Sequence, residues 1–360
     1  MNALPVDLER NAANGDLQAQ LLLGRAQEDA GSHAQARAWY GRAAAGGSLQ
    51  ARTALGISLL LHDPISPYDG VKAIIEAANG GCAQAAHLVA TMAAAGSGIP
   101  QDWNVALNAL RRSAELGWPL ARAELALLAG EPQPDPSAPP QVWRRLQDKI
   151  DLSFWALAPA VRSVYSAPRI GVIENCLPGA ICGWLVERAR PMIERARVYD
   201  AATGDGRLDT ARSNSAAEFN IADADVIVAL ARARIAAITG LPTMSMEHTS
   251  VLHYAVGQQF APHYDFLDAA APGHKLDMAR RGQRVATFLV YLSDDFEEGQ
   301  TAFLELDWKY RGRTGDAILF WNVDVSGAPD LKTRHAGLAP TRGEKWLLSQ
   351  WIREPRNAAT

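Results

Sequence analysis

Cysteine is scarce in this chain, and long apolar runs are missing. The three cysteines, Cys82, Cys176 and Cys182, do not amount to a disulfide framework and show no paired spacing of the zinc-binding kind. No apolar stretch approaches the roughly 20 residues of a membrane-spanning helix, and the first residues lack the basic flank and apolar run of a secretory signal. The net charge of −4 gives no bulk attraction to nucleic acid or to an anionic membrane. These absences predict a cytoplasmic protein with reduced thiols and with neither a nucleic-acid nor a membrane partner.

The first 130 residues are rich in alanine and leucine, and they repeat. Four segments align, with starts 32, 34 and 36 residues apart: 16–24, 48–56, 82–90 and 118–126. A small residue recurs where two helices must approach closely: Ala19, Ala51, Ala85 and Ala121. Each of the first three units ends a second helical run on a glycine that we expect to be left-handed: Gly46, Gly80 and Gly117. A two-helix unit of this period predicts a helical solenoid over residues 1–129.

These units resemble the Sel-one-like repeat, a relative of the tetratricopeptide repeat. Residues 98–107 are close to the inter-helix turn and second-helix start of that family, and the other units follow its pattern more loosely. An unrelated helical bundle with coincidental alanines is the alternative interpretation.

A change of character separates this region from the rest of the chain. Five prolines at 130–141 forbid a helix and favour an extended linker. Helices are expected at 142–155, 177–197 and 222–239, and strands at 287–292, 301–306, 317–321 and 346–352. Many short strands bounded by glycine and aspartate predict a double-stranded β-helix, or jelly roll, with flanking helices over residues 142–360. The fold class is therefore multidomain, an α-helical solenoid followed by an α+β domain, and the two halves are expected to be separate folding units.

Three residues in the second half have the chemistry of an iron site. His263 and Asp265 are two residues apart, and His335 follows 70 residues after Asp265. Alternate residues of a strand point to the same face, so His263 and Asp265 can reach one ion. Two imidazoles and one carboxylate suit iron(II) and leave positions open for a 2-oxo acid and dioxygen. Lys345, ten residues after His335, is placed to pair with an anionic co-substrate.

The set resembles the prolyl hydroxylase family of 2-oxoglutarate dioxygenases over roughly residues 169–354. Six blocks in order carry the resemblance: 254–265, 282–292, 298–303, 315–321, 335–346 and 351–352. The resemblance implies that His263, Asp265 and His335 are the catalytic residues that hold Fe(II). It implies 2-oxoglutarate and O2 as co-substrates and allows ascorbate as a further cofactor.

The resemblance also assigns residues around the metal. It implies that Lys345 pairs with the distal carboxylate of 2-oxoglutarate and that Tyr254 and Thr301 add hydroxyl donors there. Arg284 and Trp351 match positions near a substrate peptide. Plain packing is the alternative for Tyr254, Thr301 and Trp351, and a surface salt bridge is the alternative for Arg284.

Two departures leave the substrate class open. Phe260 stands where the family often has a tyrosine, three residues before the first ligand histidine, and Gln300 stands where a second glycine is usual. Retention of Asp265 disfavours the halide-binding variant of the site.

For five other histidines the sequence predicts no role in a site. His248 and His253 lie outside the motif. Three histidines lie in the helical half with no carboxylate at ligand spacing: His33, His62 and His87. His274 follows the first ligand pair, where it could touch substrate or solvent.

The predicted function is hydroxylation of a C–H bond, on a prolyl or other residue of a peptide or protein that the helical repeats recruit. The alternative is a hydroxylase of a free amino acid or small metabolite, with the repeats used for oligomerisation or partner binding. A scaffold with an inactive oxygenase domain is disfavoured, because all three ligands and Lys345 are present.

Overall fold

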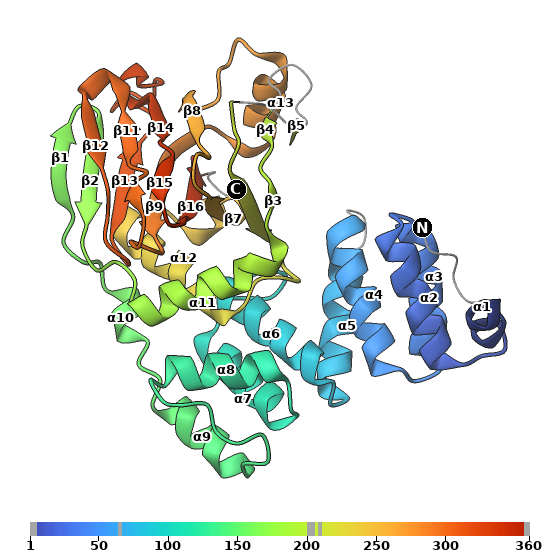
Figure 1. Cartoon of the computed structure of the whole chain (residues 1–360). Helices are drawn as coiled ribbons and strands as arrows, with labels where there is room; N and C mark the ends of the chain where they lie inside the picture. Colours follow the sequence, from blue (N-terminus) through green and yellow to red (C-terminus); the bar gives the residue numbers. More distant parts are fainter. Residues whose placement is uncertain (1–5, 64–66, 200–205, 208–210, 356–360) are drawn as a thin grey trace. The chain divides into compact units, whose positions relative to one another are not determined.

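The computed structural model describes residues 6–63, 67–199, 206–207 and 211–355, and the chain divides into two compact units (Figure 1). The first unit comprises Met1–Leu152 and Ile221–Leu230, and the second comprises Ser153–Asn220 and Ala231–Thr360. Helices build the first unit and β-sheets the second, which confirms the expected fold class. The domain bounds drawn from the sequence, with a linker at 130–141, stay a prediction beside this division.

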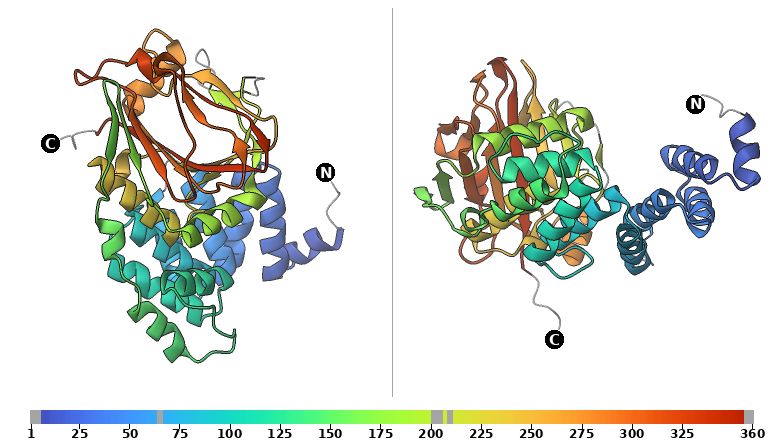
Figure 2. Two further views of the ribbon diagram at one scale, coloured as in Figure 1. Left: turned by 60° about the vertical axis from the view of Figure 1, so that its left-hand side comes forward. Right: turned by 90° about the horizontal axis from the view of Figure 1, so that it is seen from below.

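The first unit is a row of helices in which each packs on the next (Figure 2). The helices are α1 Val6–Ala13, α2 Leu17–Asp29, α3 His33–Ala45, α4 Leu49–His62, α5 Pro67–Asn79, α6 Ala83–Ala95, α7 Trp103–Glu115, α8 Pro119–Leu128 and α9 Pro140–Asp148. Contact only between near neighbours in the chain is the arrangement that a helical solenoid requires.

The N-caps of the helices recur with the period of the repeat. The first residue of each aligned segment is the N-cap of the helix that follows it: Asp16, Ser48, Cys82 and Trp118. Asp16 and Ser48 accept hydrogen bonds from the backbone N–H groups of Ala19 and Ala51, at 2.8 and 3.2 Å. These caps satisfy helix N–H groups that have no partner within the helix. The four recurring alanines are buried, as expected for a close approach of helices.

The glycines that close the repeats differ in part from expectation. The left-handed residues are Gly47 (φ 102°), Gly81 (φ 97°) and Gly117 (φ 96°). The expectation is therefore correct at Gly117 and wrong by one residue in the two preceding repeats. Gly46 and Gly80 serve packing instead, because a Cβ on Gly46 would lie 2.4 Å from Cδ2 of Leu17.

The segment 221–230 belongs to the first unit through a buried carboxylate. Oε1 of Glu124, in α8, accepts a hydrogen bond of 2.9 Å from the backbone N–H of Val226, where α12 (Val226–Thr239) begins. The second oxygen of Glu124 contacts Nε2 of His87. Burial raises the pKa of Glu124 above its ordinary value, against the effect of His87. The start of α12 therefore depends on residues of the helical repeats.

The second unit contains two facing sheets (Figure 2, left). In the described residues an eight-stranded sheet has the order β1-β2-β13-β9-β16-β7-β6-β3 and a four-stranded sheet the order β12-β11-β14-β8. Two-stranded pairs, β10-β15 and β4-β5, accompany them. The strands are β1 Arg162–Ser166, β2 Arg169–Ile173, β3 Glu194–Arg195, β4 Val198–Tyr199, β5 Gly206–Arg207, β6 Ser215–Phe219, β7 Thr249–Tyr254, β8 Phe260–His263, β9 Arg284–Tyr291, β10 Glu297–Glu298, β11 Thr301–Phe303, β12 Trp308–Tyr310, β13 Ala317–Trp321, β14 His335–Gly337, β15 Pro340–Arg342 and β16 Lys345–Arg353.

The core of this unit lies between the sheets. Its buried side chains are mostly aromatic or aliphatic: Ile170, Leu252, Tyr254, Leu289, Tyr291, Phe296, Phe303, Ile318, Phe320 and Leu347. The central strands β9 and β16 are buried at nearly every position and are mostly apolar, although Thr287, Ser349 and Gln350 lie buried among their apolar residues. The remaining helices are α10 Ser153–Ala156, α11 Gly179–Ala189 and α13 Pro272–Arg281, and α11 packs on β6 and β7.

Several element boundaries differ from those expected. The helix expected at 177–197 ends at Ala189, and a 3-10 turn over Arg190–Met192, which contains Pro191, leads into β3. The helix expected at 142–155 is divided into α9 and the short α10. The strand expected at 301–306 stops at Phe303, where a 3-10 turn takes over. In the part of the chain that the structure describes, no helix has the length and apolar character needed to cross a membrane.

Close approach between helices gives a test of the solenoid. A Cβ on Gly56 would lie 2.8 Å from the carbonyl oxygen of Gly70, so α4 and α5 would have to separate. We expect Gly56→Ala to lower the free energy of unfolding by about 1–3 kcal/mol. Gly41, in α3, has no atom within 4 Å of such a Cβ, and Gly41→Ala should raise stability by about 0.5–1 kcal/mol. Thermal unfolding followed by circular dichroism measures both, and a Gly56→Ala variant as stable as the parent would contradict the packing.

Candidate active site

Two short strands bring the three predicted ligands together. β8 and β14 are antiparallel neighbours, and their register places His263 directly opposite His335. The sequence puts Asp265 on the same strand as His263, which is wrong in detail because β8 ends at His263. The Asp265 carboxylate nevertheless reaches both imidazoles, with Oδ1 3.5 Å from Nε2 of His263 and Oδ2 3.6 Å from Nε2 of His335. The ligand atoms of the three residues all lie within 4.8 Å of one another.

Backbone carbonyls fix the orientation of both imidazoles. Nδ1 of His263 lies 2.8 Å from the carbonyl oxygen of Ala261, and Nδ1 of His335 lies 3.0 Å from that of Thr333. A carbonyl only accepts, so each Nδ1 donates, and each Nε2 presents a lone pair toward Asp265. Burial, together with the neighbouring His263, lowers the pKa of His335 to about 4. The His335 imidazole is therefore neutral near pH 7, as a metal ligand must be.

A buried hydroxyl holds the carboxylate. Thr287 donates a hydrogen bond of 2.7 Å to Oδ2 of Asp265, and the Asn322 side-chain amide donates to the Thr287 hydroxyl at 3.0 Å. Thr287 and Asn322 are completely buried. Burial opposes the charge on Asp265, but His335, His263 and Thr287 outweigh it and keep the pKa of Asp265 below its ordinary value. The sequence-based interpretation missed both supporting residues, because Thr287 lies within the apolar strand β9 and Asn322 directly after β13, with no pattern to mark them.

Lys345 lies at the start of β16, opposite Tyr254 of β7. Its side chain is fully buried, and its ammonium has no hydrogen-bond partner among the described residues. The ammonium lies 4.8 Å from the centre of the Tyr254 ring and 5.9 Å from that of Tyr291. Burial lowers the pKa of Lys345 to about 7. A buried cation without a counter-charge is suited to receive an anion.

The two predicted hydroxyl donors lie in different sheets: Tyr254 is opposite Lys345 across β7 and β16, and Thr301 is on β11 of the four-stranded sheet. Tyr254 is buried, and its hydroxyl packs so close to Gly337 that a Cβ there would lie 2.9 Å from it. Thr301 pairs with Gly337 across β11 and β14. The Tyr291 hydroxyl donates to the carbonyl oxygen of Tyr310 at 2.8 Å, so Thr301 must donate in its 2.9 Å contact with Tyr291. Thr301 must therefore rotate its hydroxyl before it can donate to a bound ligand.

The two residues predicted near substrate contact each other. The Arg284 guanidinium stacks 3.6 Å above the centre of the Trp351 ring. It also donates two hydrogen bonds to the Glu247 carboxylate, at 2.6 and 3.0 Å. Arg353 donates to the same carboxylate, at 2.5 Å. Arg284 is thus held by a partly buried ion pair, and its proposed contact with a substrate stays a prediction.

Phe260 has a definite role despite lacking the expected hydroxyl. Its ring stacks on that of His263, with centroids 3.6 Å apart and planes at 16°. The buried Arg212 guanidinium also packs on Phe260 and lies 4.6 Å from the centre of its ring. Phe260 therefore braces the first ligand histidine through packing.

The expectation that the histidines of the helical half lack carboxylate partners is wrong. His87 contacts the buried Glu124, and His33 and His62 both contact Glu28. These partners come from other helices, so spacing along the sequence did not reveal them. In the second unit, His253 packs against Trp346, with ring centroids 4.3 Å apart.

Comparison with known proteins agrees with the geometry. Residues 249–353 match the model of the 2OG-Fe(II) oxygenase superfamily. Probable prolyl 4-hydroxylase 10 of Arabidopsis thaliana is 32% identical over 206 residues, covering 52% of this chain and 69% of the relative. This chain belongs to the prolyl 4-hydroxylase-like 2-oxoglutarate and iron(II)-dependent oxygenases.

Solved structures resemble each half. A viral collagen prolyl hydroxylase from Paramecium Bursaria Chlorella virus-1, in complex with 2-oxoglutarate, is 26% identical with a TM-score of 0.38, covering 51% of this chain and 94% of that one. A Sel1 repeat protein from Oxalobacter formigenes is 25% identical with a TM-score of 0.28, covering 31% of this chain and 92% of that one.

The residues of this oxygenase fit the cofactors that the family implies. His263, Asp265 and His335 offer two imidazole nitrogens and a carboxylate, a donor set suited to iron(II) with positions left open. The unpaired ammonium of Lys345 offers a counter-charge for a dicarboxylate. His263, His335 and Lys345 are all in strands, which hold ligands more firmly than loops do.

Substitution of a metal ligand, or of the Thr287 hydroxyl that holds Asp265, should impair iron binding. We expect His263→Ala and His335→Ala to abolish 2-oxoglutarate-dependent succinate formation. Thr287→Val keeps the ligands but frees the Asp265 carboxylate, and should weaken iron binding by roughly 10–100-fold. Iron titration and succinate release measure these effects. Full 2-oxoglutarate turnover by either alanine variant would rule out this site.

Proposed function

We propose that this oxygenase hydroxylates a prolyl or other residue of a peptide or protein recruited by its helical repeats. When bound, iron(II) and 2-oxoglutarate supply the oxidation: one oxygen atom of O2 enters the substrate C–H bond, and the other enters succinate as carbon dioxide leaves. His263, Asp265 and His335 would hold the metal, and Lys345 would hold the co-substrate. The metal triad is the observation that carries the oxygenase chemistry.

Lys345 is proposed to anchor the distal carboxylate of 2-oxoglutarate. Taking an ammonium out of water costs several kcal/mol unless a counter-charge compensates. Among the described residues no carboxylate pairs with this ammonium, although the chain buries it fully. A bound carboxylate would supply that charge. Tyr254, opposite Lys345, and Thr301, opposite the Gly337 on which Tyr254 packs, would donate further hydrogen bonds to it.

Arg342 offers a matched control for this role, because it is three residues away but exposed and paired with Glu297 at 2.7 Å. We expect Lys345→Ala to raise the KM for 2-oxoglutarate by roughly tens to thousands of fold, equivalent to about 2–5 kcal/mol. Iron binding should change far less. Arg342→Ala should leave the KM unchanged. Equal 2-oxoglutarate affinity in the parent and in Lys345→Ala would assign the anchor to another cation.

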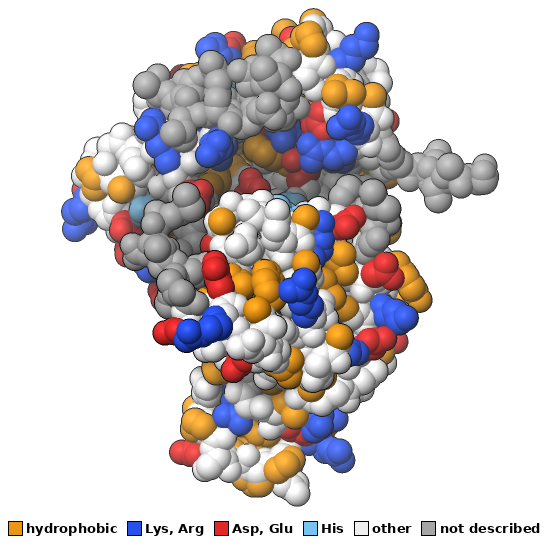
Figure 3. Space-filling view, turned by 90° about the vertical axis from the view of Figure 1, so that its right-hand side faces the viewer, with side chains coloured by type: hydrophobic (Ala, Val, Ile, Leu, Met, Phe, Trp, Pro, Cys, Tyr) orange, Lys and Arg blue, Asp and Glu red, His pale blue; other side chains and the backbone are white. Residues whose placement is uncertain are grey.

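A peptide or protein substrate is favoured by the character of the helical unit. Large apolar side chains are exposed on its helices, among them Leu22, Tyr68 and Val105, and Tyr68 is 76% exposed. Figure 3 shows a face on which hydrophobic side chains lie among charged ones of both signs. Such mixed surfaces suit polypeptide binding, and solenoids present extended surfaces of this kind. The names of the relatives add that they are prolyl 4-hydroxylases.

A free amino acid or small metabolite is the second candidate, favoured by Phe260. Its ring packs on His263 and brings no hydroxyl beside the metal site. On this alternative the repeats would serve oligomerisation or partner binding. The use of ascorbate and a cytoplasmic location stay predictions.

Mass spectrometry can distinguish the two substrates. The full chain, with iron(II) and 2-oxoglutarate, is incubated with proline-containing peptides and with free proline, lysine and arginine, and a gain of one oxygen is sought. We expect oxygen on peptides, and none with the His335→Ala variant. Tyr68→Ala should raise the KM for the peptide but leave uncoupled succinate release unchanged. Met244→Ala, which alters a side chain 90% exposed in the second unit, is its control.

Oxygen found on free amino acids alone would establish the small-substrate alternative. Point variants serve better here than a chain beginning near Val142. Such a chain would lack Glu124, the partner of the backbone N–H of Val226, and would leave residues 221–230 without the helices they pack on.

A further inference from the structure

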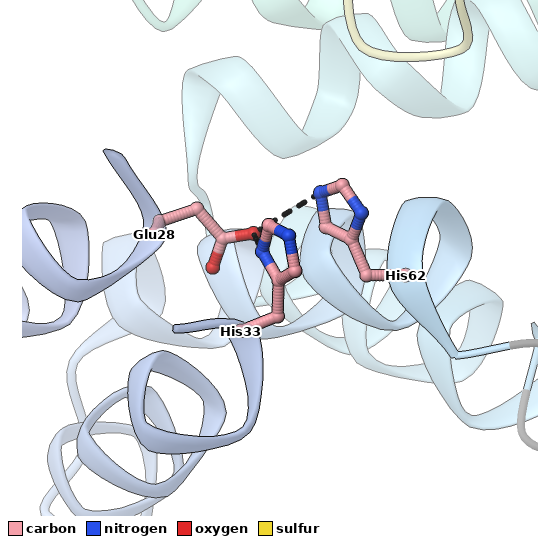
Figure 4. A group of neighbouring side chains, drawn as sticks. All are labelled: Glu28, His33 and His62. Carbon is pink, nitrogen blue, oxygen red and sulfur yellow. Dashed lines mark hydrogen bonds and ion pairs between the residues drawn. The ribbon is translucent and has the colours of Figure 1, made fainter. Parts of the chain in front are cut away.

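A second group of metal-binding side chains lies in the helical unit, far along the sequence from the oxygenase residues. Glu28 is in the last turn of α2, His33 is the first residue of α3, and His62 is the last residue of α4. Figure 4 shows the three side chains turned toward one another from these helices. We propose that Glu28, His33 and His62 form a binding site for a divalent cation of the zinc class.

The distances suit a small cation. Oε1 of Glu28 lies 3.0 Å from Nδ1 of His33 and 3.3 Å from Nε2 of His62. Ligand atoms about 2.0–2.1 Å from a tetrahedral zinc ion lie about 3.3 Å apart. The three ligand atoms lie within 4.8 Å of one another. The group therefore needs little contraction to surround one ion, and a fourth position remains for water.

The imidazoles can make the remaining adjustment. Their rings stack with centroids 3.6 Å apart and planes at 12°, so at least one must rotate out of the stack to aim its lone pair at a shared ion. Both lie at helix ends, and their side chains are 34% and 33% exposed. Because each side chain is about one-third exposed, the ion would have access from solvent.

A hydroxyl already orients the carboxylate. Ser58, in α4, donates to the Glu28 carboxylate, with Oγ 3.1 Å from each of its oxygens. Support of this kind is usual around metal ligands, which are themselves hydrogen-bonded by neighbouring groups. Ser58 is 1% exposed, so its hydroxyl is fixed in place.

The ligands are not part of the repeat pattern. When the units are aligned on Asp16, Ser48 and Cys82, the place of Glu28 is taken by Leu60 and Ala94. Thus the solenoid does not need a carboxylate there. The place of His62 is taken by Ala30 in the first unit and by Gly96 in the third. Glu28 and His62 therefore depart from the pattern at two separate places, and they meet His33 at one point.

The chemistry identifies the class of ion. Two imidazoles and one carboxylate favour zinc and its neighbours among the transition metals over magnesium or calcium, which prefer oxygen ligands. Bound here, the ion would link the end of α4 to the α2–α3 pair of the preceding repeat. Its expected effect is to stiffen the beginning of the solenoid.

Zinc titration of the full chain, free of any affinity tag, tests the site. The His263→Ala/His335→Ala variant serves as the parent, because it removes the oxygenase site as a competitor. We expect one equivalent of zinc by calorimetry and a rise in Tm. His62→Ala and Glu28→Gln in that parent should weaken binding by more than the roughly 10–100-fold that loss of a supporting residue costs. Ser58→Ala keeps all three ligands and should fall within that range.

Two further measurements keep the outcome decisive. His248→Ala, which removes an exposed histidine of the second unit, should bind zinc like its parent. Cobalt(II) should give a visible absorption band in the parent that is lost in His33→Ala, while circular dichroism confirms that the variant is folded. Zinc affinity that is the same in the parent, His62→Ala and Glu28→Gln would overturn the proposal and leave the three residues as a hydrogen-bonded group.

Discussion

The pairing of β8 with β14 is the contact on which the active site depends. It places His263 and His335 opposite each other although they are 72 residues apart in the chain. Opposed residues of antiparallel strands lie close enough for their side chains to interact. The next strand, β11, pairs its Phe303 with His335 and its Thr301 with Gly337, on which the Tyr254 hydroxyl packs. This register therefore fixes two of the three metal ligands, and Asp265, two residues after the end of β8, completes the triad.

The eight-stranded sheet contributes a buried positive charge, which calls for an anion. β16 lies between β9 and β7, and it begins with Lys345, a cation buried without a counter-charge among the described residues. Such a residue costs stability, so the surrounding sheet must hold it by packing. The four-stranded sheet supplies ligands for a cation, and the eight-stranded sheet supplies a binding group for an anion. Their facing arrangement is what makes a site for a metal and a dicarboxylate together.

The helical unit follows a different physical rule. Its helices meet through alanine and glycine, so backbones approach closely and little room remains for change at those positions. Polar residues that depart from the repeat pattern therefore point to a specific contact or site. Glu124 with His87 supports the start of α12, and Glu28 with His33 and His62 forms the proposed cation site. Glu124 and His87 are 37 positions apart in the chain, and His62 lies 34 positions after Glu28.

How much of the fold and of the site the sequence predicts depends on how far apart in the chain the interacting residues are. The helical period and the strands around Phe288, Phe320 and Leu348 follow from local patterns, which nearby residues largely determine. The ordered spacing of His263, Asp265 and His335 likewise predicted a group that the folded chain brings together, whereas the role of Lys345 in co-substrate binding stays a prediction.

Other features were decided only by the folded chain. The end of β8 at His263, the left-handed turns at Gly47 and Gly81, and the short β11 depend on how neighbouring elements pack. The same holds for the hydrogen bonds of Thr287 with Asp265 and of Arg284 with Glu247. Their partners lie 22 and 37 residues away, and no local pattern specifies such a distance. Sequence thus determined which chemical groups are present and the type of each element, while tertiary structure decided which groups meet, because meeting depends on strand register and helix packing across the whole unit.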